Sequence, residues 1–250
     1  MKHKFLLIVL ISIGLISCKS RYQITSVSGK IVEMSASLDD KPHAKMQSLV
    51  SKYKTLLDEE MSEVIGTSTQ LMDYHLPESL LTNFTSDVMK AYGDEHIPGG
   101  ADVAVMNLNG HRANMPEGPI TVGNMYEIYS FDNTITFLDL KGSELNKIFK
   151  AYARMGGSGI SKNVKLVIEN RKIKSATIDG NPIDENKIYK IVTLDYLAEG
   201  NNGMDAFKNA QETINSGITL RDIMIDYVRE QTRRGQQISS VLDGRITVTK

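Results

Sequence analysis

The chain of 250 residues has the composition of a globular protein, with 41% hydrophobic and 24% charged residues. Its 29 basic and 30 acidic side chains nearly cancel, so no excess of positive charge is available to attract a nucleic-acid backbone. A single cysteine excludes disulfides within the chain, so a packed hydrophobic core must stabilise the fold.

The first twenty residues, MKHKFLLIVLISIGLISCKS, have the order of an export signal. Lys2 and Lys4 precede an apolar run that is too short and wrongly flanked for a stable transmembrane helix. Residues 15–18 (LISC) resemble the bacterial lipoprotein box, which implies removal of residues 1–17 and lipidation of Cys18. The expected location is therefore the bacterial cell envelope, lipid-anchored on the periplasmic face or at the cell surface. The alternative is a plain cleaved signal with an incidental buried thiol.

Residues 18–64 are expected to lead from this anchor to the main domain. Residues 19–40 alternate loosely, as in one or two edge strands or a tether. A helix is predicted over 41–61, with one apolar stripe that consists of Met46, Leu49, Val50, Tyr53, Leu56 and Leu57. Both signs of charge on its polar face argue against a membrane-lying helix. This leaves a helix that packs on its own domain or one that spaces the domain from the anchor.

Residues 65–250 predict an α+β domain in which a mixed sheet is flanked by helices. Helices are predicted over 77–92, 124–129, 142–155 and 219–234. Strands are predicted within 101–108, 134–140, 163–170, 172–178, 187–197 and 245–249, with a hairpin turn near Arg171. Glu78 is expected in the first turn of its helix, where a carboxylate suits the helix dipole.

Residues 107–118, NLNGHRANMPEG, place a glycine and an arginine directly after a predicted strand. Gly110 allows close approach to the backbone, and Arg112 together with exposed turn amides makes a site for a phosphate or carboxylate. Taken alone, the pattern favours ordinary turn chemistry with a solvated or paired arginine. The context of motifs elsewhere in the chain decides between an anion site and an ordinary turn.

That context is a series of five motifs in a fixed order: NLNGHR at 107–112, GPIT at 118–121, SFDN at 130–133, LKGSEL at 140–145 and YLAEGNNG at 196–203. In this order and spacing the chain from about residue 65 resembles the C-terminal, substrate-binding domain of 5'-nucleotidases. That family includes UDP-sugar hydrolases and 2',3'-cyclic-nucleotide phosphodiesterases. The resemblance implies the fold of that domain and a nucleotide or nucleoside as ligand.

The resemblance also implies a substrate-binding role for eight residues: His75, Asn107, Gly110, Arg112, Phe131, Asn133, Tyr196 and Asn202. Phe131 and Tyr196 would sandwich the base, Asn107 would contact the base, and Arg112 would reach toward the phosphate. Stacking on aromatic rings is worth about 1–3 kcal/mol per base. The alternative for either ring alone is packing in the core.

Several positions depart from the family pattern, among them Thr82, which replaces a glycine. His75 replaces an arginine that binds the phosphate, and Asn202 replaces an aspartate that holds the ribose hydroxyls. Asn109 and His111 replace a glycine and an isoleucine, and are expected to crowd a turn that the family leaves open. These departures therefore imply weaker binding of the phosphate and altered recognition of the sugar.

The chain lacks the ligand motifs of the two-metal phosphoesterase domain that hydrolyses the substrate in complete members of the family. Residues 94–96 (DEH) match Asp-x-His but have no companion motif, and are predicted to form a solvated loop. No catalytic residue, metal ligand or cofactor is therefore predicted in this chain.

Two functions follow. In the first, the chain is the substrate-binding half of a split 5'-nucleotidase in nucleotide catabolism, inactive alone, and a separate metallophosphoesterase chain carries the divalent metals. In the second, it is a non-enzymatic envelope lipoprotein that binds nucleotides or nucleosides or interacts with other proteins.

Overall fold

The computed structural model describes residues 23–249 except 32, 34, 39, 41 and 42, so Cys18 and the export signal lie outside the described residues. The chain divides into two units, residues 1–50 and 51–250, and the division falls within helix α2 (Ala44–Met61). The described part of the first unit holds the 3-10 turn η1 (Ala36–Leu38) and the start of α2. Within the described chain, every helix is too short or too polar to cross a membrane.

Helix α2 confirms the helix predicted over 41–61. None of its residues is buried, and the six side chains of the predicted apolar stripe are between 53% and 68% exposed. Residues 23–31 form neither helix nor strand, so the edge strands that their alternation allowed are not present there.

A five-stranded mixed sheet forms the centre of the second unit, with the strand order β10-β4-β9-β2-β5. The bounds of its strands are β2 (Val103–Met106), β4 (Thr134–Lys141), β5 (Gly159–Ile160), β9 (Ile188–Leu194) and β10 (Glu212–Thr219). Strand β2 runs parallel to β9, whereas β4 runs antiparallel to it. The carboxyl ends of β2 and β9 and the amino end of β4 therefore meet at one edge of the sheet.

Two smaller sheets complete the strands. One pairs β1 (Val64–Ser68) with β3 (Gly118–Thr121), and the other has the order β11-β6-β7-β8, with β6 (Val164–Glu169), β7 (Lys172–Ile178), β8 (Asn181–Pro182) and β11 (Ile246–Thr249). The predicted hairpin is confirmed: β6 and β7 are antiparallel, and Asn170 and Arg171 form the turn with φ values of 51° and 58°.

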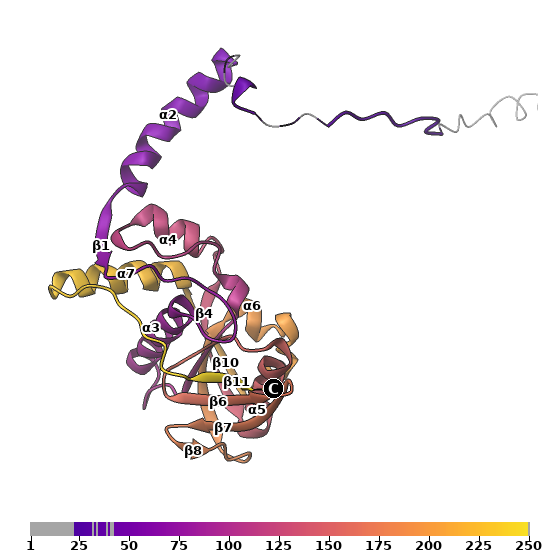
Figure 1. Cartoon of the computed structure of the whole chain (residues 1–250), viewed down its shortest axis with the longest axis vertical. Coiled ribbons are helices and arrows are strands. Elements are labelled where there is room, and N and C mark those ends of the chain that lie inside the picture. The colour runs from indigo at the N-terminus through magenta and orange to yellow at the C-terminus, as the bar shows by residue number, and fades with distance from the viewer. Residues whose placement is uncertain (1–22, 32, 34, 39, 41–42, 250) are drawn as a thin grey trace, which may run out of the picture. The chain divides into compact units, whose positions relative to one another are not determined.

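Five helices accompany these sheets: α3 (Leu80–His96), α4 (Val122–Ile128), α5 (Gly142–Met155), α6 (Asp195–Ala198) and α7 (Leu220–Arg233). Figure 1 shows α3 and α5 on either side of strands β4 and β10. Strand β2 is buried along its whole length, as expected of a strand that is covered on both faces. The predicted α+β fold is thus confirmed.

The structure corrects two expectations about α3. Glu78 lies before the helix and not in its first turn, because the Ser79 hydroxyl caps the helix by accepting a hydrogen bond from the backbone N–H of Thr82. Residues 94–96 form the last turn of α3 and not a loop, because the helix continues until the N–H of Ile97 donates to the carbonyl of Gly93.

A buried charge cluster fixes the C-terminal segment to α3. The guanidinium of Arg245, which is 1% exposed, donates to both carboxylate oxygens of Asp87 at 2.8 and 3.0 Å and to Asp243 at 3.1 and 2.9 Å. These carboxylates offset the desolvation of the guanidinium and raise the pKa of Arg245. The Glu78 carboxylate adds a second link, because it accepts from the Asn83 side chain at 2.7 Å and from the backbone N–H of Asp243 at 3.0 Å.

Candidate functional site

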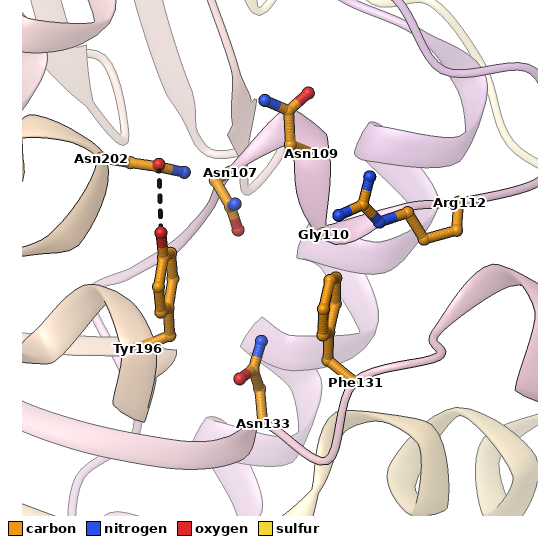
Figure 2. A pocket seen from close by; sticks show the side chains of 8 residues that line it. All are labelled: Asn107, Asn109, Gly110, Arg112, Phe131, Asn133, Tyr196 and Asn202. Atoms are coloured by element: carbon orange, nitrogen blue, oxygen red, sulfur yellow. Dashed lines mark hydrogen bonds between the residues drawn. The ribbon is translucent and has the colours of Figure 1, made fainter. Parts of the chain in front are cut away.

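A pocket of about 280 Å³ lies where the ends of β2, β9 and β4 meet. It is lined by eight residues: Asn107, Asn109, Gly110, Arg112, Phe131, Asn133, Tyr196 and Asn202 (Figure 2). Asn107 directly follows β2, and Tyr196 lies in α6 just after β9. Asn133 directly precedes β4, and Phe131 lies two residues before Asn133. The sheet topology therefore brings together segments that are far apart in the sequence.

Seven of the eight predicted site residues line this pocket, and His75 does not. The His75 side chain is exposed, with its Nε2 atom 3.7 Å from Oδ2 of Asp73 and its Nδ1 atom 3.1 Å from the carbonyl oxygen of Leu76. His75 therefore lies outside the lining of this pocket, and its role toward a phosphate stays a prediction. Asn109, which was not among the predicted site residues, also lines the pocket.

The rings of Phe131 and Tyr196 form opposite walls, and Figure 2 shows both nearly edge-on with the pocket between them. They are 43% and 39% exposed, so neither ring is packed in the core, which was the alternative left by the sequence. The hydroxyl of Tyr196 lies 3.4 Å from Oδ1 of Asn202, and the backbone N–H of Tyr196 donates to the carboxylate of Asp195 at 2.7 Å. The gap between the rings suits a flat aromatic ligand.

Asn107 lies between these walls as an unpaired amide. Its side chain is 8% exposed, its Oδ1 atom is buried without a hydrogen-bond partner, and it does not cap the following 3-10 turn η2 (Leu108–Gly110). A buried unpaired polar atom costs about 1–3 kcal/mol. A ligand that presents an N–H group beside an acceptor would satisfy the amide, since a side-chain amide both donates and accepts.

The absence of a side chain at Gly110 matters for the packing beneath the turn. A Cβ atom at this position would lie 2.7 Å from Cε of Met106 and 3.1 Å from Oδ1 of Asn107. The missing side chain therefore leaves room for the Asn107 amide and the core beneath it. Gly110 also lines the pocket, and close approach of a ligand to its backbone stays a prediction.

Arg112 is exposed, and its Cζ atom lies 4.8 Å from the centroid of the Phe131 ring. Its backbone N–H donates to the carbonyl of Ile128 at 3.0 Å. Within the described part of the chain, its guanidinium makes no hydrogen bond or ion pair, and it contacts the Phe131 ring.

His111 points into the domain and does not crowd the pocket, contrary to expectation. It is 1% exposed, its Nδ1–H donates to the carbonyl of Leu108 at 3.1 Å, and Nε2 lies 2.9 Å from the Thr85 hydroxyl. The Thr85 hydroxyl also lies 2.8 Å from the hydroxyl of Tyr129. Burial lowers the pKa of His111 to about 4, so the imidazole is neutral near neutral pH.

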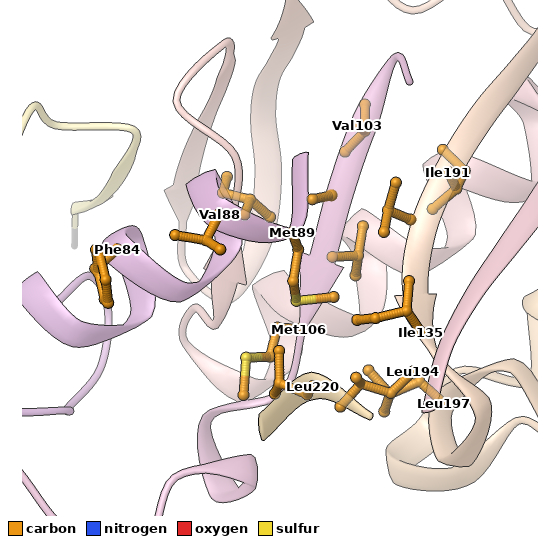
Figure 3. Close-up of a cluster of buried hydrophobic side chains, with 14 of the residues drawn as sticks. Phe84, Val88, Met89, Val103, Met106, Ile135, Ile191, Leu194, Leu197 and Leu220 are labelled. Atoms are coloured by element: carbon orange, nitrogen blue, oxygen red, sulfur yellow. The ribbon is translucent and has the colours of Figure 1, made fainter. Parts of the chain in front are cut away.

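Buried side chains anchor the elements that carry the pocket. Figure 3 shows Met106, Ile135, Leu194, Leu197 and Leu220 in one part of the hydrophobic core. Met106 precedes Asn107 in the chain, Ile135 follows the Asn133 segment, and Leu194 and Leu197 flank Tyr196. The pocket residues are thus held by close-packed neighbours on rigid elements.

Among residues 23–249 that the structure describes, no three or more His, Cys, Asp or Glu side chains are placed to hold a metal ion. The lining of the pocket contains amides, two aromatic rings and one guanidinium, and no carboxylate or imidazole. Its chemistry is that of binding a flat polar molecule.

Comparison with known proteins agrees with this geometry. The family model for the 5'-nucleotidase, C-terminal domain matches residues 64–209. Protein UshA of Yersinia enterocolitica is 30% identical over 137 residues, which cover 53% of this chain and 25% of that protein. Protein UshA of Escherichia coli is 24% identical over 229 residues, which cover 89% of this chain and 41% of that protein.

Solved structures show the same fold. A 5'-nucleotidase precursor from Thermus thermophilus matches with a TM-score of 0.72 and 23% identity, over 83% of this chain and 43% of that one. The NAD nucleotidase of Haemophilus influenzae matches with a TM-score of 0.63 and 18% identity, over 88% of this chain and 46% of that one. The chain spans less than half the length of these relatives.

Proposed function

The chain belongs to the family of 5'-nucleotidase C-terminal domains, and from this premise we propose that it is the substrate-binding half of a split 5'-nucleotidase. In this proposal it holds a nucleotide while a metallophosphoesterase on a separate chain supplies the divalent metals and the hydrolytic chemistry. The chain alone is then inactive.

The observation that carries the proposal is the pair of exposed rings with an unpaired amide between them. Phe131 and Tyr196 offer two stacking faces, and the Asn107 amide offers a donor and an acceptor to the edge of a base. A buried unpaired amide oxygen costs the unliganded protein stability, and a bound base that donates to it would remove that cost. Asn109, Asn133 and Asn202 add amides around the ligand.

We propose further that lipidation of Cys18 holds the protein at the cell envelope, where exported nucleotides would be its substrates. The support is the order of the leader, with two lysines, an apolar run and the LISC segment. Labelled palmitate should enter the wild-type protein in the cell and should not enter Cys18→Ser, and incorporation into the variant would refute the assignment.

Binding is tested by titration calorimetry with AMP. The wild-type protein should bind AMP without added metal, and Phe131→Ala and Tyr196→Ala should each weaken binding at least about tenfold, which corresponds to the worth of one stacking face. Tyr53→Ala is the matched control, because Tyr53 is a 62% exposed aromatic on α2 outside the pocket. Equal affinity in all four proteins would refute the pocket assignment.

The split arrangement needs a second test. A metallophosphoesterase encoded beside this chain should release phosphate from AMP faster with the wild-type protein than alone, and Tyr196→Ala should remove that gain. If the mixture is no faster than the partner alone, the split enzyme is wrong, and nucleotide binding without hydrolysis remains as the function.

A further inference from the structure

The lining of the pocket carries little charge with which to recognise a phosphate. Arg112 is the single charged side chain among the eight that line the pocket. Two carboxylates stand next to pocket residues in the chain: Asp132 follows Phe131 and pairs with Arg221, and Asp195 precedes Tyr196. Arg221 offsets the charge of Asp132, so Arg112 is the one lining side chain that offers a phosphate an opposite charge.

The guanidinium of Arg112 is also in contact with an aromatic ring. The guanidinium of Arg112 lies over the Phe131 ring, with 4.8 Å between Cζ and the ring centroid. In Figure 2 the Arg112 side chain lies beyond Phe131 as seen from Tyr196. A guanidinium that covers one face of a half-exposed ring restricts the motion of that ring and leaves its other face for a ligand.

We propose that this pocket recognises its ligand through the flat base, so that nucleosides bind about as tightly as nucleotides, and that Arg112 acts as a positioning residue for Phe131. This inference rests on the proposed function, because it assigns the ligand class of the same pocket. In the complex, the guanidinium of Arg112, the Phe131 ring, the base and the Tyr196 ring are then stacked in that order. The product of phosphate removal would bind in competition with the substrate.

The test is calorimetry of the full chain with adenosine, AMP and ribose 5-phosphate, for the wild-type protein, Arg112→Met and Arg112→Lys. Lysine keeps the positive charge for a phosphate but lacks the planar guanidinium that stacks on a ring. The wild-type protein should bind adenosine and AMP with dissociation constants within about threefold, and ribose 5-phosphate should not compete. Arg112→Met should weaken adenosine and AMP by the same factor, about two- to fivefold, as expected for an exposed cation–π contact. Arg112→Lys, whose ammonium can still lie over the ring, should weaken both ligands equally and by no more than that factor.

A different pattern would overturn the inference. If AMP binds the wild-type protein more than about tenfold tighter than adenosine, and the difference is lost in Arg112→Met but kept in Arg112→Lys, then the charge of Arg112 holds the phosphate. That result would leave the proposed function intact. If neither ligand binds the wild-type protein, the proposed function and this inference both fail. Arg112 is exposed, so the urea midpoints of the variants should match the wild type.

Discussion

The buried imidazole of His111 should make the stability of the domain depend on pH. Folding lowers its pKa from about 6.5 in the unfolded chain to about 4. Between these values the unfolded chain binds a proton that the folded protein does not, so the free energy of unfolding falls as the pH falls. The contribution is complete above about pH 6.5 and is lost by about pH 4, with a loss of about 2 kcal/mol between about pH 7.5 and pH 5.

Urea unfolding followed by circular dichroism at about pH 7.5 and pH 5 measures this loss. His111→Gln cannot titrate there, so its pH dependence should be smaller than that of the wild type by about 2 kcal/mol. His75→Gln is the control, because it removes an exposed histidine and leaves the contacts of His111 with Thr85 and Leu108 in place. If His111→Gln shows the same pH dependence as the wild type, the buried neutral imidazole is not the cause and the reasoning is refuted.

Three further variants test single features. Asn107→Ala should leave the urea midpoint unchanged or raised, because its amide oxygen is buried and unpaired, while AMP binding in calorimetry weakens; a clear loss of stability would contradict this. Gly110→Ala should also weaken AMP binding, since the new Cβ meets Met106 and Asn107, and unchanged affinity would show that the turn yields. Arg245→Met should lower the free energy of unfolding in urea by about 3–5 kcal/mol, against less than about 1 kcal/mol for Arg229→Met at an exposed pair.

Periodicity predicted the elements whose side chains face the core. Helices α3, α5 and α7 and the β6–β7 hairpin have regular apolar spacing, because each buries one face. Strand β10 escaped prediction because its residues, ETINSGIT, are almost all exposed. Strand β10 is held by backbone hydrogen bonds to β4. Because β4 is distant in the sequence, this pairing leaves no hydrophobic pattern in the residues of β10.

The order of the motifs predicted most of the residues that line the pocket, but it could not predict the directions of their side chains. Within one turn, Asn107 and Asn109 line the pocket while His111 enters the core, because the 3-10 turn η2 rotates successive side chains. The contact between Arg112 and Phe131 also has no sequence signal, since the two residues lie on segments that only the fold brings together. His75 occupies the motif position of an arginine, yet its side chain lies exposed beside Asp73 and outside the lining of the pocket.

The meeting of three strand ends at one sheet edge has a thermodynamic consequence. Asn107, Phe131 and Tyr196 come within reach of one ligand only when β2, β4 and β9 are paired, so the unfolded chain has no such site. A ligand at about one hundred times its dissociation constant would therefore add about 2.7 kcal/mol to the free energy of unfolding. The melting temperature of the protein would thus report which compounds the pocket accepts, with no need for catalysis or for a second chain.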